Sequence, residues 1–114
     1  MLTVESLKAY GANTDEGLGR CFNNEAFYLR LVGMGLADAN FDRLKDALAA
    51  RDSKAAFEAA HALKGSIGNL ALTPIYNPVS ELTEKLRGQA DMVDVGDLAN
   101  EVFAQLEKAR ALLG

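Results

Sequence analysis

The sequence predicts an all-α protein, an antiparallel four-helix bundle with short N-terminal capping helices. Apolar residues recur at spacings of three and four along most of the chain, which is the period of an amphipathic helix. No segment shows the apolar and polar alternation of a half-buried strand, and the only prolines are Pro74 and Pro78. Four amphipathic segments joined by short connections can bury their apolar stripes only against one another, which favours a bundle.

Two short helices are expected before the bundle, at about residues 3–9 and 14–22. Gly11 and Asn13 separate them, because glycine and asparagine interrupt helices. Cys21, near the end of the second one, is expected to be a small buried apolar residue.

The first long helix is predicted over residues 24–50. Asn23 or Asn24 can act as its N-cap by accepting hydrogen bonds from the amides of the first turn. Gly33 and Gly35 lie inside this helix and could bend it. Its expected core stripe consists of Phe27, Leu31, Met34, Ala37, Phe41, Leu44 and Leu48.

The third and fourth long helices follow the segment that contains the two prolines. Thr73-Pro74 and Asn77-Pro78 each pair a capping residue with a proline suited to the first helical position, so the third helix starts at one of them. Pro78 inside that helix would distort its first turn, and Gly88 is the expected stop. The expected stripes are Ile75, Val79, Leu82 and Leu86 in the third helix, and Val95, Leu98, Val102, Leu106, Ala109 and Leu113 in the fourth.

The second long helix carries the residues that point to a function. It is expected to begin at Asp52 or Ser53 and to run to Asn69. At about 100° per residue, His61 points almost directly away from the inward face. That inward face comprises Ala56, Ala59, Ala60, Leu63, Ile67 and Leu70.

Four residues share the outward stripe of this helix with His61: Phe57, Lys64, Gly65 and Gly68. Each interior glycine costs roughly 1 kcal/mol of helix stability relative to alanine. Either a partner approaches this face closely, or the glycines permit close helix packing. Phe57 either leaves apolar area for a partner or packs against a neighbouring helix. We interpret the stripe as a docking surface centred on His61.

The chemistry open to His61 is narrow. It is the only histidine, and the chain has one cysteine, so neither a Cys/His zinc cluster nor an internal disulfide can form. A histidine is largely uncharged near neutral pH and can take a phosphoryl group on a ring nitrogen. The ammonium of Lys64, one turn on, would stabilise that group. The stripe has no carboxylate pair for Mg²⁺, so we expect the partner to bring the metal.

Composition limits the partners further. Lys and Arg number 12 against 16 Asp and Glu, a net charge of −4 with no basic block, which argues against nucleic acid or an anionic membrane. No apolar run is long enough for a membrane span, and the N-terminus lacks the pattern of a signal peptide. We therefore expect one cytoplasmic domain over residues 1–114, a monomer because the apolar stripes are used up inside one bundle.

The segment His61-Ala62-Leu63-Lys64-Gly65-Ser66 resembles the H-x-L-K-G-S signature of histidine-containing phosphotransfer (Hpt) domains. These domains carry phosphoryl groups between receiver domains in two-component phosphorelays. The similarity extends over most of the chain, since Asn23-Asn24-Glu25 with Phe27-Tyr28 is similar to the opening of the family's long helix, Leu44 to Asp52 to its end, and Glu81-Leu82 to the helix after the histidine. Many members have a glycine ten residues after the histidine, where this chain has Ala71.

The resemblance implies that His61 is the phosphoacceptor, that Lys64 supports it electrostatically and that Gly65 gives clearance. Phe57 and Gly68 are assigned to partner docking from the helical geometry alone. The function expected is that of a phosphocarrier without autokinase activity and without a cofactor of its own, because the receiver domains of response regulators or hybrid histidine kinases supply Mg²⁺.

Three other interpretations were weighed. The chief alternative is a helical adaptor that binds a receiver or another signalling protein without accepting phosphate. A bundle enzyme with a buried cofactor is disfavoured, because no metal-ligating residues interrupt the core stripes. Calcium binding at Asp91, Asp94 and Asp97 is disfavoured because the spacing lacks the loop glycine and terminal glutamate of a calcium loop.

Overall fold

A computed structural model describes residues 1–114 and contains seven helices and no strand, which confirms the all-α prediction. None of the helices combines the length and the apolar character that a membrane span requires. In chain order the helices are α1 (Val4–Tyr10), α2 (Thr14–Arg20), α3 (Glu25–Leu36), α4 (Asn40–Ala49), α5 (Ser53–Asn69), α6 (Thr73–Leu86) and α7 (Gly96–Ala111).

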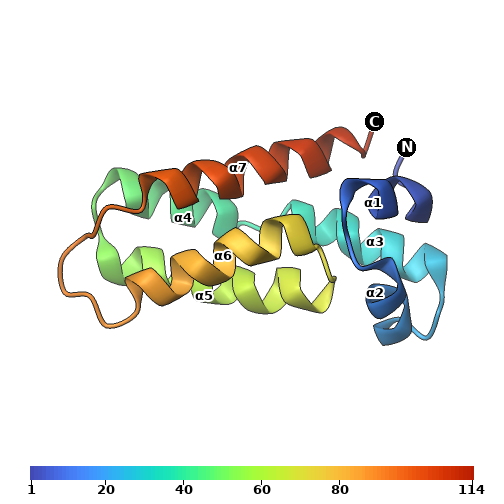
Figure 1. Ribbon diagram of the computed structural model, residues 1–114, viewed down its shortest axis with the longest axis horizontal. Helices are drawn as coiled ribbons and strands as arrows, with labels where there is room; N and C mark the ends of the chain where they lie inside the picture. The colour runs from blue at the N-terminus through green and yellow to red at the C-terminus, as the bar shows by residue number, and fades with distance from the viewer.

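Helices α4 to α7 form the antiparallel bundle. Each packs against the next along the chain, and successive helices run in opposite directions (Figure 1). Two cations of α4 and α7 help to close the bundle: Lys45 lies 5.9 Å from the centroid of the Phe103 ring, and Arg110 lies 5.9 Å from that of Phe41. The core between these helices contains almost all of the inward residues predicted for α5, α6 and α7; the exception is Leu113, which lies beyond the end of α7 and is 45% exposed.

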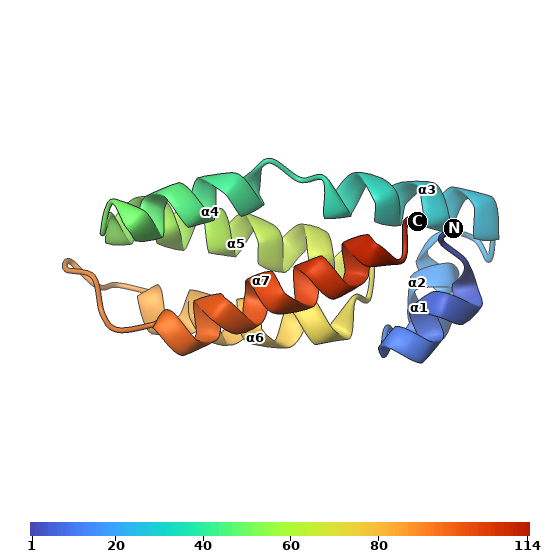
Figure 2. The ribbon, with the colours of Figure 1, turned by 90° about the horizontal axis from the view of Figure 1, so that it is seen from above.

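The prediction of one continuous helix over residues 24–50 is wrong. Helix α3 ends at Leu36 and α4 begins at Asn40, with a short non-helical stretch between them (Figure 2). Asp38 causes part of this break, because its Oδ1 accepts a hydrogen bond from the backbone N–H of Asn40 at 2.8 Å. The guanidinium of Arg110 donates to the carbonyl of Leu36 at 3.0 Å and so satisfies the end of α3.

The break also changes which residues of α3 are buried. The core stripe predicted for residues 24–50 holds in α4 and only in part in α3. Phe27 and Leu31 are half-buried against the core, whereas Met34 is 65% exposed and Ala37, just after the helix, is exposed as well. The side chains of α3 that are buried are Tyr28, Val32 and Leu36. The three residues between the two helices, 37–39, shift the phase of the period, so a stripe counted back from α4 falls beside the most buried face of α3 and not on it.

The structure shows where α5 and α6 begin, for each of which the sequence offered two possible starts. Asp52 caps α5 by accepting from the N–H of Ala55 at 3.0 Å. Helix α6 begins at Thr73 with Leu72 as its N-cap residue, so Thr73 is not the capping residue that the sequence predicted. Pro74 lies in the first turn, and Pro78 is buried inside the helix. Proline is tolerated in the first turn because the N–H that it lacks has no helical partner there.

The predicted N-terminal helices are present as α1 and α2, and they lie with α3 at one end of the bundle (Figure 1). This segment satisfies carbonyl groups at the C-terminal end of α5, which a helix leaves without intrahelical partners. The donors are the side chain of Arg20 to Gly68 at 2.7 Å, the phenol of Tyr28 to Leu70 at 2.9 Å and the N–H of Asn13 to Ala71 at 2.9 Å. Cys21 is buried here, as predicted.

Candidate functional site

His61 stands on the exposed face of α5 with its ring against Phe57. Its side chain is exposed, and its ring centroid lies 5.6 Å from that of Phe57 with an angle of 15° between the ring planes. The four-residue spacing on one helix makes this stacking possible. Phe57 itself is half-buried. It packs against the core and still leaves apolar area exposed, so each of the two alternatives considered for it holds in part.

Lys64 lies one turn after His61 and is paired across to α6. Its Nζ is 3.7 Å from Oε1 of Glu84, while Nε of Arg87 donates to Oε2 of the same carboxylate at 2.7 Å. Arg87 also lies over the Phe57 ring, 5.1 Å from its centroid. Two cations and one carboxylate therefore form a chain beside His61, and Arg87 connects it to the ring that stacks on His61.

Electrostatics keep this carboxylate ionised. The hydrogen bond from Arg87 is the main cause that lowers the pKa of Glu84 below its usual range, and the positive charges of Arg87 and Lys64 act in the same direction. The reciprocal effect raises the pKa of Arg87. Sequence reasoning singled out neither residue. The three-residue spacing of Glu84 and Arg87 marks a helical ion pair, but nothing in it indicates that α6 turns this pair toward His61.

The two glycines of the stripe differ. A Cβ atom at Gly65 would meet nothing within 4 Å, so this position is open toward solvent beside His61. A Cβ atom at Gly68 would lie 2.9 Å from Cε1 of Tyr76, a side chain of α6. Of the two alternatives left open for these glycines, close helix packing therefore holds for Gly68, which permits the approach of Tyr76.

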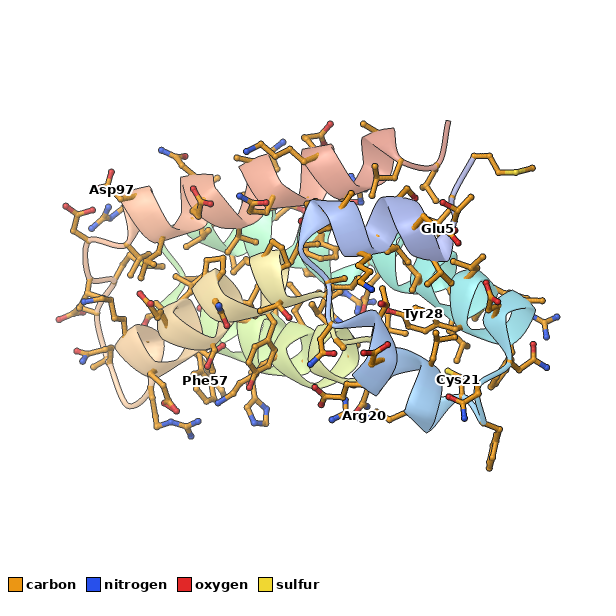
Figure 3. The ribbon with its side chains drawn as sticks, turned by 45° about the vertical axis from the view of Figure 1, so that its right-hand side comes forward. Glu5, Arg20, Cys21, Tyr28, Phe57 and Asp97 are labelled. Atoms are coloured by element: carbon orange, nitrogen blue, oxygen red, sulfur yellow. The ribbon has the colours of Figure 1, made fainter.

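An open cleft of about 730 Å³ adjoins His61 between α2, α5 and α6. From α5 and the residues after it come His61, Lys64, Gly65, Gly68, Asn69 and Ala71, and from α6 come Thr73, Tyr76 and Asn77. The rest of the lining is Asn13, Glu16 and Arg20. In Figure 3, Arg20 and Phe57 lie along the same edge of the molecule. The contribution of α2 was not foreseen, because the sequence pattern does not say where a short N-terminal helix packs.

The polar groups that α2 and its N-cap residue bring to the cleft are already partnered. Arg20 pairs with Glu16 on its own helix while it donates to Gly68, and Asn13 donates to Glu16 at 3.1 Å. No group of three or more His, Cys, Asp or Glu side chains is placed to hold a metal ion. What the site offers chemically is a nucleophilic imidazole that solvent or a partner can reach, with an ammonium and a guanidinium close by.

Comparison with known proteins supplies one match. A family model described as the Hpt domain matches residues 35–112, about two thirds of the chain. The matched region includes α4 to α7 with His61, Lys64, Glu84 and Arg87, and it leaves α1, α2 and most of α3 outside. Neither the curated proteins nor the solved structures compared with the chain gave a match.

Proposed function

The chain belongs to the Hpt family, which has a histidine phosphotransfer role in phosphorelays and generally interacts with receiver domains; on that premise we propose that it is a phosphocarrier. His61 accepts a phosphoryl group from the aspartyl phosphate of one receiver and passes it to another. The observation that carries this proposal is the exposed imidazole of His61, inside the matched region, with Lys64 one turn away. An Hpt domain is typically a carrier and not a kinase.

The transfer needs no group beyond those of the two proteins and the receiver's metal. The unprotonated ring nitrogen of His61 attacks the phosphorus, a nitrogen–phosphorus bond forms, and the acyl phosphate P–O bond breaks. The aspartate carboxylate of the receiver is the leaving group, and the proton on the other ring nitrogen stays or passes to solvent. Because both linkages are energy-rich, the exchange is close to balanced and reversible.

Lys64 is proposed to stabilise the phosphoryl group as it moves. Charge spreads over the oxygens of the transferring group, and a cation placed beforehand stabilises this charge. The Lys64 side chain is 29% exposed, which leaves its ammonium in reach of a group on His61. We propose that the receiver binds Mg²⁺, since the carboxylate nearest Lys64, that of Glu84, is already paired with two cations.

Gly65 and Phe57 are proposed to contact the receiver. Gly65 leaves open space on the turn after His61, so a partner's backbone can approach the imidazole closely. Phe57 offers the exposed part of a half-buried ring beside it. Gly68 lines the cleft but is partly covered by Tyr76, so its share in docking is expected to be smaller.

The test is phosphoryl transfer from a purified receiver phosphorylated in the presence of Mg²⁺. The wild-type chain is expected to gain an acid-labile, alkali-stable label, and His61→Gln is expected to lose it with an unchanged melting temperature. Lys54→Ala, an exposed change in the first turn of α5, is the control and should label normally. Label that persists in His61→Gln would place the acceptor elsewhere. Receiver binding without label in the wild type would identify an adaptor instead.

A further inference from the structure

Glu84 is the one acidic residue that is tied to both cations of the site. Its Oε1 faces Nζ of Lys64 at 3.7 Å, and its Oε2 accepts from Arg87 at 2.7 Å. Arg87 is held a second time by its stacking on Phe57, whereas the Lys64 ammonium is paired with Glu84 alone. Lys64 is therefore the cation that can leave Glu84 more easily.

We propose that Glu84 competes with the phosphoryl group on His61 for Lys64. In the unphosphorylated protein Glu84 holds the ammonium toward α6. A phosphoryl group carries close to two negative charges and three strong acceptor oxygens, so it outcompetes a single carboxylate for the same ammonium. The proposal rests on His61 being the phosphoacceptor, which is the proposed function.

The exposure of the pair decides how strong this competition is. The side chains of Lys64 and Glu84 are 29% and 53% exposed, and ion pairs of this kind are weak and screened by salt. Such a pair can exchange its cation without a conformational change. Glu84 also repels the phosphoryl group, because its carboxylate stays ionised near neutral pH. Both effects oppose phosphorylation of His61, so removing the charge of Glu84 should favour it.

The experiment uses phosphoramidate, a small-molecule phosphoryl donor, so that no receiver takes part. Transfer forms the nitrogen–phosphorus bond to His61, breaks the donor's phosphorus–nitrogen bond and releases ammonia. Glu84→Gln is expected to label about two- to fivefold faster than wild type, the range that an exposed ion pair allows. Glu25→Gln makes the same charge change on α3, far from the site in the sequence and in no ion pair, and should label like wild type.

Two further measurements separate competition from a structural effect. In a Lys64→Ala background, Glu84→Gln should lose the part of its gain that comes from competition for Lys64 and keep only the part that comes from the removed repulsion. The gain should also shrink in 1 M salt, where the screening length falls to about 3 Å. Circular dichroism and the melting temperature check folding, and Glu84→Ala should change the rate in the same direction as Glu84→Gln.

Two results for Glu84→Gln would overturn the proposal, and two results for the wild type distinguish its failure from that of the proposed function. Labelling of Glu84→Gln at the rate of Glu25→Gln would overturn the proposal, and slower labelling would overturn it by showing that Glu84 holds Lys64 in its productive position. Wild-type protein that takes label from phosphoramidate but never from a phosphorylated receiver would end the relay function while leaving the result on Glu84 intact. Wild-type protein that takes label neither from phosphoramidate nor from a phosphorylated receiver would end both.

Discussion

At the scale of single residues, the two glycines after His61 can be separated by their surroundings. Gly65→Ala is expected to stabilise the protein by about 1 kcal/mol, since alanine is the better helix former and its Cβ meets nothing. Gly68→Ala should gain nothing or lose stability, because its Cβ would lie 2.9 Å from the Tyr76 ring. Urea unfolding of the two variants measures the difference; equal gains would show that Tyr76 moves aside freely.

The same substitution tests the docking role of Gly65. If the glycine is kept for the partner, Gly65→Ala should slow transfer from a phosphorylated receiver although it stabilises the chain. Labelling by phosphoramidate, which is small, should remain close to that of wild type.

Ala71 is strained by its backbone. It lies in the turn between α5 and α6 with φ of 56°, the left-handed region that side chains disfavour. Ala71→Gly is expected to stabilise the fold by about 1 kcal/mol, the strain relieved exceeding the added flexibility of the unfolded chain. The urea midpoint measures this, with Ala62→Gly as the control, which should destabilise because residue 62 is inside α5. Loss of stability in Ala71→Gly would show that the turn is unstrained.

Contacts within one helix could be predicted from the sequence, whereas contacts between two helices could not. The exposure of His61 with Phe57 and Lys64 beside it could be predicted because all three lie on one helix, where spacing fixes direction. Glu84 and Tyr76 could not be predicted as neighbours of this stripe, because they come from α6 and depend on how two helices pack. The sequence pattern says which face of each helix is buried, but not the rotation and offset that bring Glu84 to Lys64.

At the scale of helices, the break between α3 and α4 was hidden by its composition. Residues 37–39 contain no proline or glycine, and the apolar positions before the break happen to continue the stripe of α4. Asp38 is the one residue in this stretch that indicates a helix break. Its side chain can accept a hydrogen bond from a nearby backbone N–H in place of a helical carbonyl. In the structure it does so with Asn40, and its other oxygen accepts from Ser66 of α5 at 3.2 Å.

Ser66, the last residue of the segment that resembles the family signature, therefore has a structural role. Ser66→Ala removes the bond between α5 and the start of α4 and is expected to cost about 1 kcal/mol. Its rate of labelling by phosphoramidate should not change, because the hydroxyl is engaged with Asp38. Ser80→Ala is the control: it brings the same gain in helix propensity without breaking a hydrogen bond. A labelling rate that falls in Ser66→Ala would instead place the hydroxyl in the transfer step.

At the scale of the whole molecule, the segment before the family match completes the bundle and the cleft. Its side chains occupy the carbonyl groups at the end of α5, and Asn13, Glu16 and Arg20 of this segment line the cleft beside His61. The molecule is elongated, 43 × 24 × 20 Å, and its two termini lie close together at the end that carries α1 (Figure 1). The two short helices and their position as a cap could be predicted from the sequence, but the long-range hydrogen bonds that hold them to the end of α5 could not.

Tyr28 connects this cap to the bundle and makes stability depend on pH. Burial, with a smaller effect from Cys21, raises its pKa from 10.0 to about 12. Between pH 10 and 12 the unfolded chain therefore loses the phenolic proton while the folded chain keeps it, so stability falls as pH rises. Below pH 10 both states hold the proton, and this contribution to stability is fully present.

Tyr28→Phe is expected to lower stability by about 1 kcal/mol at pH 8, since the hydrogen bond to Leu70 is lost. It should also lose stability less steeply than wild type from pH 10 to 11.5. Tyr28→Phe should still lose some stability as the pH rises, because burial and the charge of Glu101 raise the pKa of Tyr10 to about 12 as well. Urea unfolding at both ends of this range measures the two slopes, and Tyr10→Phe combined with Tyr28→Phe should flatten the curve further. Parallel curves for wild type and Tyr28→Phe would show that the phenol ionises alike in the folded and unfolded chains, so that the cap is open to water at this position.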